Sequence, residues 1–123
     1  MRPKRKQVSK PINNMDASSL LSKRAELTPD RVALREVATC QSYTFAQLNS
    51  RVNRACHFLQ KLGVQQGEVV SLLAHNSVVY IDLLYAATKI GAIFSPLNWR
   101  LVAEELAYIV QDCGSKVLIC GPE

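Results

Sequence analysis

The sequence predicts an α/β fold: a partial three-layer arrangement in which helices flank a mostly parallel sheet, preceded by an N-terminal hairpin. From residue 44 onward, helical and extended patterns alternate, which is typical of right-handed crossovers between parallel strands. The extended segment 68–74 is apolar without clean alternation, as expected for a strand covered on both faces. With 123 residues, the chain is long enough for one domain with a core and too short for two.

A helix and a hairpin are expected first. The helix should span residues 15–27, with Asp16 as its N-cap, and Thr28-Pro29-Asp30 should end it. Its apolar side would consist of Leu20, Leu21 and Ala25. Segments 31–37 and 41–45 have extended patterns on either side of a short turn, which predicts two strands paired as a hairpin.

The clearest helix signal begins at Thr44. Thr44 and Gln47 have the spacing of a capping box, in which the two side chains satisfy free backbone N–H groups. Apolar residues then recur at steps of four and three and form one helical stripe: Leu48, Val52, Ala55, Leu59 and Leu62. Polar residues should lie away from this stripe: Arg51, Arg54, His57 and Lys61. Gly63 should end the helix, because glycine readily adopts the left-handed conformation.

Strands and helices then alternate. The strand over 68–74 is followed by the polar loop 75–77 and a helix over 78–90, which is apolar nearly all round and should pack deeply. A strand over 92–95, a helix over 102–113 and a strand over 116–120 complete the chain. The helix over 102–113 should turn one set of side chains inward: Leu106, Ile109, Val110 and Cys113. Its acidic residues should face outward: Glu104, Glu105 and Asp112.

The net charge of +5 comes from one end of the chain. Five of the 15 basic residues lie in the first ten positions, which leaves ten basic against ten acidic residues in the rest. We expect residues 1–14 to form a disordered basic tail, with a weak contact to a membrane surface or nucleic acid as the alternative. Residues 15–123 lack the charge excess of a nucleic-acid-binding face, so we expect no nucleic-acid partner.

Cysteine usage and hydropathy exclude further classes of protein. Four cysteines show neither CxxC nor Cys/His metal spacing, which favours reduced thiols in a cytoplasmic protein: Cys40, Cys56, Cys113 and Cys120. No apolar run reaches the roughly 18 residues of a membrane span, since the nearest one, 78–94, contains Asp82, Lys89 and Gly91. We therefore expect neither a metal site nor a transmembrane segment.

Functional side chains are expected where the parallel strands end, because ligands of open α/β sheets bind at the carboxyl edge. The predicted ends are residues 75–77, 95–98 and Gly121-Pro122. No GxGxxG motif is present. Gly114-Ser115-Lys116 lacks the upstream glycine of a phosphate loop and precedes a strand, so we interpret it as a helix stop.

Single residues at these places have competing interpretations. His75 could act as a base or a phosphate contact, although a loop histidine bonded to backbone is commoner. Ser77 lacks the partner base of a nucleophile and is better explained as an N-cap. Asp82 in an apolar helix invites a catalytic interpretation, but a buried carboxylate must be paired, which favours a hydrogen-bonded position. Glu104 and Glu105 are sequence neighbours and form no paired-carboxylate site.

Nine short motifs in a fixed order resemble one family. They are 28–34 (TPDRVAL), 43–49 (YTFAQLN), 62–64 (LGV), 67–70 (GEVV), 76–77 (NS), 87–91 (ATKIG), 96–101 (PLNWRL), 103–109 (AEELAYI) and 116–119 (KVLI). Together they resemble the beginning of an adenylate-forming enzyme of the acyl-CoA synthetase type, related to firefly luciferase and to the adenylation domains of peptide synthetases. The resemblance covers about residues 20–123.

The resemblance implies that residues 15–123 are an incomplete N-terminal subdomain of an AMP-binding domain, the front part of the large domain of these enzymes. Members use ATP and Mg²⁺ to convert a carboxylic acid into an acyl-adenylate, and then pass the acyl group to a thiol, usually coenzyme A. Residues 98–101 (NWRL) are more similar to fatty-acyl or aryl-acyl CoA ligases than to peptide synthetases. The implied substrate is therefore a fatty or aryl acid.

The family's phosphate loop, its Tyr-Gly-x-Thr-Glu segment, its ribose-binding Asp and its C-terminal Lys have no counterpart in these 123 residues. We therefore assign no catalytic, cofactor-binding or metal-binding residue, and expect the chain alone to be inactive and to bind no cofactor tightly. Segment 84–101 should be a corner of the scaffold, in which Asn98 satisfies loop backbone, Trp99 packs over the following helix and Arg100 pairs with an acid.

The alternative hypothesis is a non-catalytic interaction module derived from the same scaffold. A short parallel sheet leaves an edge with free backbone groups, and exposed edges recruit further strands. Self-association through this edge is the partner contact that the alternative predicts.

Overall fold

The computed structural model describes residues 16–122, and within them it confirms the predicted alternation of helices and strands. The basic tail expected over residues 1–14 lies outside the described residues, as does Met15. The helices are the 3₁₀ turn η1 (Ala17–Ser19), α1 (Leu20–Leu27), α2 (Phe45–Lys61), α3 (Val78–Ile90) and α4 (Ala103–Asp112). The strands are β1 (Val32–Glu36), β2 (Gln41–Thr44), β3 (Val69–Leu73), β4 (Ile93–Pro96) and β5 (Ser115–Cys120).

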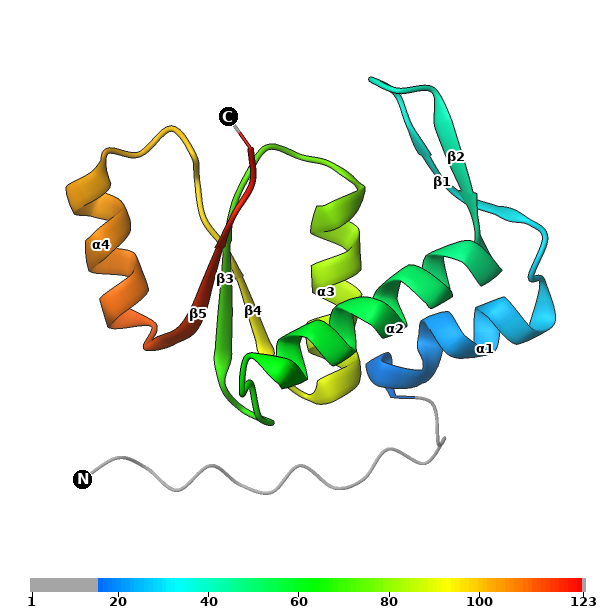
Figure 1. Ribbon diagram of the computed structural model, residues 1–123, viewed down its shortest axis with the longest axis horizontal. Coiled ribbons are helices and arrows are strands. Elements are labelled where there is room, and N and C mark those ends of the chain that lie inside the picture. The colour runs from blue at the N-terminus through cyan, green and yellow to red at the C-terminus, as the bar shows by residue number, and fades with distance from the viewer. Residues whose placement is uncertain (1–15, 123) are drawn as a thin grey trace.

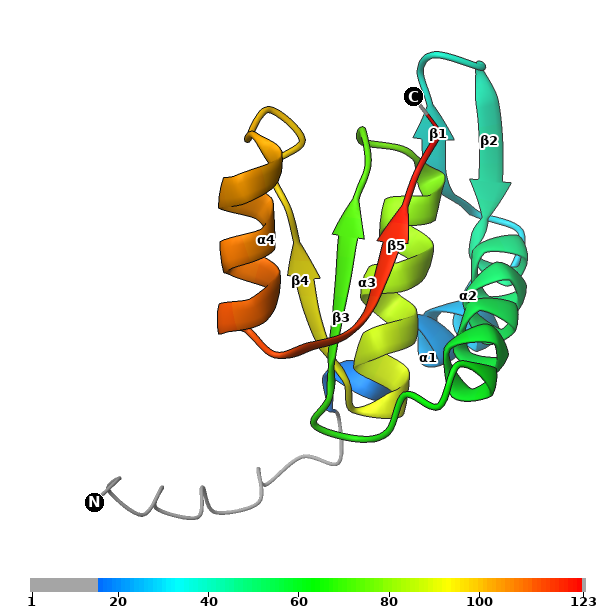
Figure 2. The ribbon, with the colours of Figure 1, turned by 60° about the vertical axis from the view of Figure 1, so that its left-hand side comes forward.

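The main sheet has three parallel strands in the order β4-β3-β5. Helix α3 lies on one face of this sheet with α2 packed against it, and α4 lies on the other face (Figures 1 and 2). The middle of β3 is no more than 1% exposed: Val70, Ser71 and Leu72. The partial three-layer α/β fold is therefore as predicted, and β3 is its enclosed centre.

The predicted hairpin is also present. β1 and β2 pair antiparallel, from Val32 opposite Thr44 to Glu36 opposite Gln41. The hairpin stands apart from the main sheet, at the end of α2 where that helix begins (Figure 1). Its turn places Cys40 at a φ of +57°, a left-handed conformation that glycine adopts more readily.

The core lies between the sheet and the α2–α3 pair. The stripe predicted for α2 supplies three buried side chains: Leu48, Val52 and Leu59. Leu62 does not continue the stripe, because it follows the last helical residue and is 43% exposed. The prediction missed Cys56, which is buried and whose thiol donates to the carbonyl oxygen of Ala86 in α3 over 3.7 Å.

The first helix is shorter than predicted. Asp16 is an N-cap, with Oδ1 accepting from the Ser19 N–H at 3.1 Å, but it caps η1, and α-helical structure begins only at Leu20. Leu21 is 4% exposed, whereas Leu20 is 49% exposed. The apolar side is therefore narrower than expected, because an eight-residue helix with mostly polar side chains presents few of them to α2.

Helices α3 and α4 match their predicted ranges to within a residue and differ in depth of packing. Helix α3 is less enclosed than expected, since Val79 is 44% and Leu84 40% exposed. The predicted inward side chains of α4 are only half-buried: Leu106, Ile109, Val110 and Cys113. Helix α4 alone covers this face of the sheet (Figure 2). Its inward side chains contact the strands but have no neighbouring helix to cover their flanks, so solvent reaches them.

Replacement of Thr44 by alanine is expected to lower the free energy of unfolding by about 1 kcal/mol, because its hydroxyl accepts from the Gln47 N–H at the start of α2. The control is Ser50→Ala at an exposed position of the same helix, expected to change it by less than about 0.5 kcal/mol. Urea denaturation followed by circular dichroism measures both. Equal stability of the two variants would contradict the capping role.

Candidate functional site

The carboxyl ends of the three parallel strands lie together, as predicted, and two aromatic rings mark them. His75 follows β3 and Trp99 follows β4; their ring centroids are 4.2 Å apart and their planes are tilted by 50°. The guanidinium carbon of Arg100 lies 5.1 Å from the centroid of the Trp99 ring. Since Trp99 is 49% exposed, these side chains form an aromatic cluster with tilted rings that solvent reaches.

A cavity of about 470 Å³ opens beside this aromatic cluster. It is lined by the two rings and by the ends of β3 and β5: Leu73, Ala74, His75, Trp99, Cys120, Gly121 and Pro122. A Cβ on Gly121 would lie 2.7 Å from the Cβ of Ala74, so the close approach of the two strand ends requires glycine. The Gly121 N–H donates to the Leu73 carbonyl at 2.9 Å and fixes this approach.

The lining of this cavity favours contact with an apolar or aromatic ligand. Its rings suit a flat ligand, and its strand ends are apolar. The described contact of the His75 ring is with Trp99, and the expected hydrogen bond to backbone is not among the described hydrogen bonds.

The turn after β4 was interpreted as a corner, and its geometry agrees in part. The Asn98 side chain accepts from the Arg100 N–H at 3.0 Å, which confirms that it satisfies loop backbone. Trp99 contacts His75, where we expected it to pack over the following helix. Arg100 forms no ion pair with a described acid and lies over the Trp99 ring instead, in the geometry of a cation–π contact.

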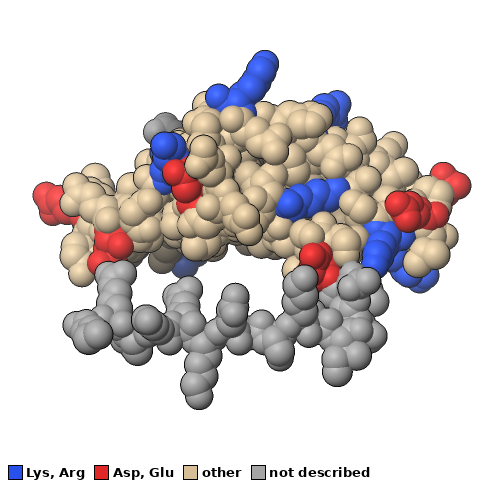
Figure 3. Space-filling model, turned by 90° about the horizontal axis from the view of Figure 1, so that it is seen from below, with Lys and Arg blue, Asp and Glu red and all other residues tan. Residues whose placement is uncertain are grey.

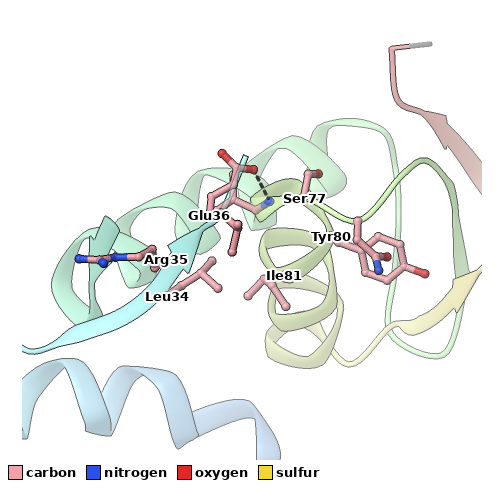
Figure 4. A pocket seen from close by; sticks show the side chains of 9 residues that line it. Leu34, Arg35, Glu36, Ser77, Tyr80 and Ile81 are labelled. Carbon is pink, nitrogen blue, oxygen red and sulfur yellow. Dashed lines mark hydrogen bonds between the residues drawn. The ribbon is translucent and has the colours of Figure 1, made fainter. Parts of the chain in front are cut away.

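A second cavity, of about 420 Å³, lies between the hairpin and the start of α3 (Figure 4). Leu34 of β1 and Ile81 of α3 face each other across it (Figure 4). At its rim, Glu36 Oε1 accepts the Val78 N–H at 3.3 Å. Ser77 occupies the N-cap position, as predicted, but its side chain accepts no cap hydrogen bond. The Glu36 carboxylate from the hairpin is the acceptor instead.

The environment of Glu36 favours its charged form. The Thr39 hydroxyl donates to Oε2 at 2.7 Å, and this bond, followed by the Val78 N–H and the charge of Arg51, lowers the pKa of Glu36 below its ordinary 4.5. A carboxylate at a helix N-terminus also interacts favourably with the positive end of the helix dipole. Glu36 therefore links the hairpin turn to the first turn of α3.

Asp82 is paired, as predicted. It is 6% exposed, and Arg51 of α2 binds it in a fork: Nη2 lies 2.6 Å from Oδ2, and Nε lies 3.2 Å from both carboxylate oxygens. The hydrogen bond to Asp82 raises the pKa of Arg51. Arg51 also lies over the ring of Tyr43, 5.0 Å from its centroid. The catalytic interpretation of Asp82 thus gives way to a structural one.

A polar cluster on α2 and α3 was not predicted. The ammonium of Lys89 donates to Asn49 Oδ1 at 2.6 Å and to Asn53 Oδ1 at 2.8 Å. Burial lowers the pKa of Lys89 and raises that of the Cys56 thiol. The helical spacing of Asn49 and Asn53 is readable in the sequence, but their common partner in α3 is not.

The N-termini of the three longer helices differ in how their first N–H groups are capped. The start of α2 is closed by its own capping box, and that of α3 by Glu36. At the start of α4, Glu105 Oε2 accepts the Val102 N–H at 3.2 Å, but Val102 has no side-chain oxygen to accept the N–H groups of the first turn. A phosphate site at a helix N-terminus needs such N–H groups free. Residues 16–122 contain no group of three or more His, Cys, Asp or Glu side chains that could hold a metal ion.

The Gly114-Ser115-Lys116 segment is a helix stop, as interpreted. Gly114 has a φ of +64° directly after α4. The Ser115 hydroxyl donates to the Val117 carbonyl, and Lys116 Nζ lies 3.8 Å from Glu68 Oε1. Both polar side chains are therefore engaged within the fold.

Charged side chains of both signs are interspersed on the face shown in Figure 3. The described part of this face carries no continuous basic surface of the kind that nucleic-acid binding uses. All four cysteines are free thiols. No helix among residues 16–122 is long and apolar enough to cross a membrane.

Comparison with known proteins identifies relatives of the whole folded part. The family model described as AMP-binding enzyme matches residues 21–123. A long-chain-fatty-acid–CoA ligase of Mycobacterium tuberculosis is 42% identical over 102 residues, which cover 83% of this chain and 20% of the ligase. A feruloyl-CoA synthase of an Amycolatopsis species is 37% identical over 112 residues, which cover 91% of this chain and 22% of the synthase.

Solved structures agree. The inhibitor-bound N-terminal domain of FACL13 from Mycobacterium tuberculosis superimposes with a TM-score of 0.83 at 41% identity, covering 85% of this chain and 26% of that one. The o-succinylbenzoate CoA synthetase of Bacillus subtilis, solved with ATP and magnesium, gives 0.77 at 30% identity, covering 83% and 27%. The chain thus spans about a fifth of the length of the curated relatives it matches.

Glu36→Gln is expected to weaken the acid sensitivity of the fold. Because its pKa is lowered in the folded state, ionised Glu36 stabilises the protein fully above about pH 4.5, and this stabilisation is lost as the pH falls through the lowered value. Wild-type stability should therefore fall more steeply than that of Glu36→Gln between about pH 5 and pH 3. The exposed Glu26→Gln of α1 is the control and should follow the wild type; parallel curves for all three would contradict the role of Glu36.

His75→Ala is expected to shift the fluorescence emission of Trp99 to longer wavelength, because the imidazole shields part of the indole from water. Trp99 is the single tryptophan of the chain, so the signal has one source. His57→Ala on the exposed side of α2 is the matched control and should leave the spectrum unchanged. An unchanged spectrum for His75→Ala would show that the contact does not persist in solution.

Proposed function

Because the chain belongs to the AMP-binding enzyme family, we propose that it forms the N-terminal segment of an ATP-dependent acid–thiol ligase. Such a ligase joins a carboxylic acid to AMP with release of pyrophosphate, and then transfers the acyl group to coenzyme A. The carboxylic acid is fatty or aryl, a class supported by the relatives named for long-chain fatty acids and for feruloyl-CoA.

One observation carries this proposal: the match to these enzymes is continuous over residues 21–123 and includes every strand of the main sheet. Sheet order and helix placement depend on the whole of that segment, and not on a local motif. The solved N-terminal domains of FACL13 share this arrangement at 41% and 40% identity. Identity at this level indicates a common family and not only a common fold.

The role that residues 16–122 support is that of a scaffold. The described residues contain neither the glycine-rich phosphate loop of the family nor a cluster of metal-binding side chains, so ATP and Mg²⁺ would be held by other parts of such a ligase. We assign no catalytic residue here. A cytoplasmic location is part of the proposal and is supported by four free thiols, which persist in a reducing compartment.

A second function, a non-catalytic interaction module, is favoured by the thin covering of the α4 side of the sheet. Tyr108 on α4 is 69% exposed and Leu118 on β5 is 45% exposed. Apolar side chains at such positions are typical of surfaces that another protein layer covers.

A graft tests the proposed function. Residues 21–122 of this chain should replace the matched segment of the mycobacterial long-chain-fatty-acid–CoA ligase and keep ATP–pyrophosphate exchange within about tenfold of that ligase, a change of about 1.4 kcal/mol in the barrier. The expected reason is that the segment supplies packing and no reacting group. Exchange is measured with a long-chain fatty acid, ATP and labelled pyrophosphate.

The 123-residue chain alone, assayed in the same way, should give no exchange above background, because phosphate stabilisation supplies most of the catalysis in such reactions. A graft that is folded by circular dichroism but inactive would contradict the scaffold role. Exchange by the isolated chain would contradict the assignment of catalysis to other parts of the ligase.

A further inference from the structure

A third cavity, of about 270 Å³, lies where the hairpin meets the start of α2. Four of its lining residues recur on α2 at helical spacing and therefore share one face of that helix: Gln47, Ser50, Arg51 and Arg54. The end of the hairpin supplies the rest of the lining: Gln41, Ser42 and Tyr43. The whole lining thus comes from β2 and the first part of α2.

The polar side chains of this lining have hydrogen-bond donors to spare. Ser42 Oγ accepts from Arg35 Nε at 3.1 Å, which leaves the hydroxyl proton of Ser42 available. Gln47 Oε1 accepts the Thr44 N–H at 2.9 Å, which leaves the NH₂ group of Gln47 available. The hydroxyl of Ser50 has no partner among the described hydrogen bonds and is a further donor.

Two guanidinium groups add positive charge to these donors. Arg51 binds Asp82 through Nε and Nη2, so Nη1 takes no part in that pair. Arg54 is exposed, and the described residues offer it no ion pair. A guanidinium stays protonated at any physiological pH. The cavity is therefore bordered by two permanent positive charges, of which that of Arg54 is not compensated.

The acids nearest to the cavity are engaged elsewhere. Asp82 is held in the fork of Arg51. Glu36 contributes to the raised pKa of Arg51, but its carboxylate accepts from the Thr39 hydroxyl and the Val78 N–H. Neither acid lines the cavity, so neither would meet a bound anion directly.

We propose that this cavity binds one phosphate group, as inorganic phosphate or as the end of a small phosphomonoester. The planar fork of a guanidinium matches the oxygens of phosphate, and a dianion complements two such groups. Phosphate also has more acceptor oxygens than a carboxylate and can use the hydroxyl and amide donors as well. The volume lies below the range of about 300–1,000 Å³ of pockets for drug-sized ligands, so it suits the phosphate group and not a whole nucleotide.

Side chains carry this site, because the capping box already occupies the N-terminus of α2. The inference stands apart from the proposed function. It needs neither ATP nor catalysis, so its failure would leave the assignment to an acid–thiol ligase untouched.

Titration of the isotope-labelled 123-residue chain with inorganic phosphate, over about 0.1–30 mM at constant ionic strength and followed by NMR, tests the site. Signals of residues 41–54 should shift and reach saturation, which locates the site without any variant. Methyl phosphate distinguishes the two sources: saturation by it as well supports a monoester site, and saturation by phosphate alone supports a site for the free ion. Acetate should bind at least about tenfold more weakly than phosphate. Shifts without saturation, shifts centred elsewhere, or equal binding of acetate would overturn the proposal.

A matched pair of variants separates local recognition from net charge. Arg54→Gln should weaken phosphate binding at least about tenfold, because it removes the uncompensated guanidinium. Lys61→Gln removes one positive charge from an exposed position near the end of the same helix and should leave the affinity within about twofold. Equal affinities of the two variants would overturn the proposal. Circular dichroism confirms that both variants are folded.

Discussion

The fold depends on enclosing β3. A parallel strand with apolar residues on both faces is stable in water only when strands flank its edges and helices cover its faces. The two faces of the sheet are covered to different extents. Helix α3, with α2 packed against it, covers one face fully, whereas α4 covers the other face with half-buried side chains. Ser71, the one polar residue at the centre of β3, points to that thinner side, where its hydroxyl lies 3.9 Å from the Cys113 thiol.

Charged residues connect the elements around this centre without creating a reactive site. The forked Arg51–Asp82 pair joins α2 to α3, and Glu36 joins the hairpin to the start of α3. A carboxylate at the N-terminus of the helix that follows the central strand is notable, because in nucleotide-binding α/β folds that position receives phosphate. Here the chain's own anion takes the place of a ligand, which fits a scaffold. At the carboxyl edge of the sheet, the tilted rings of His75 and Trp99 remain exposed to solvent.

Local signals in the sequence predicted local structure well. The capping box of Thr44 and Gln47 and the left-handed stop at Gly114 depend on neighbouring residues, and both are present. The parallel sheet followed from the alternation of elements, because the handedness of crossovers leaves few topologies. Contacts between distant segments were not predictable: Glu36 is 42 residues from the N–H it caps, and Arg51 is 31 residues from Asp82. Their residue types permit such contacts, but only the folded chain brings them together.

The register of β3 against β5 also has a consequence for synthesis on the ribosome. Val69 pairs with Ser115, so β3 is made well before the strand that closes its second edge. The hairpin and the α2–α3 pair make their contacts over shorter stretches of chain and can assemble first, because loop closure is less costly for them. During translation, β3 can therefore pair only with β4 until β5 has been synthesised. The face that α4 covers thinly is also completed last, because α4 and β5 are the last elements of the chain to be made.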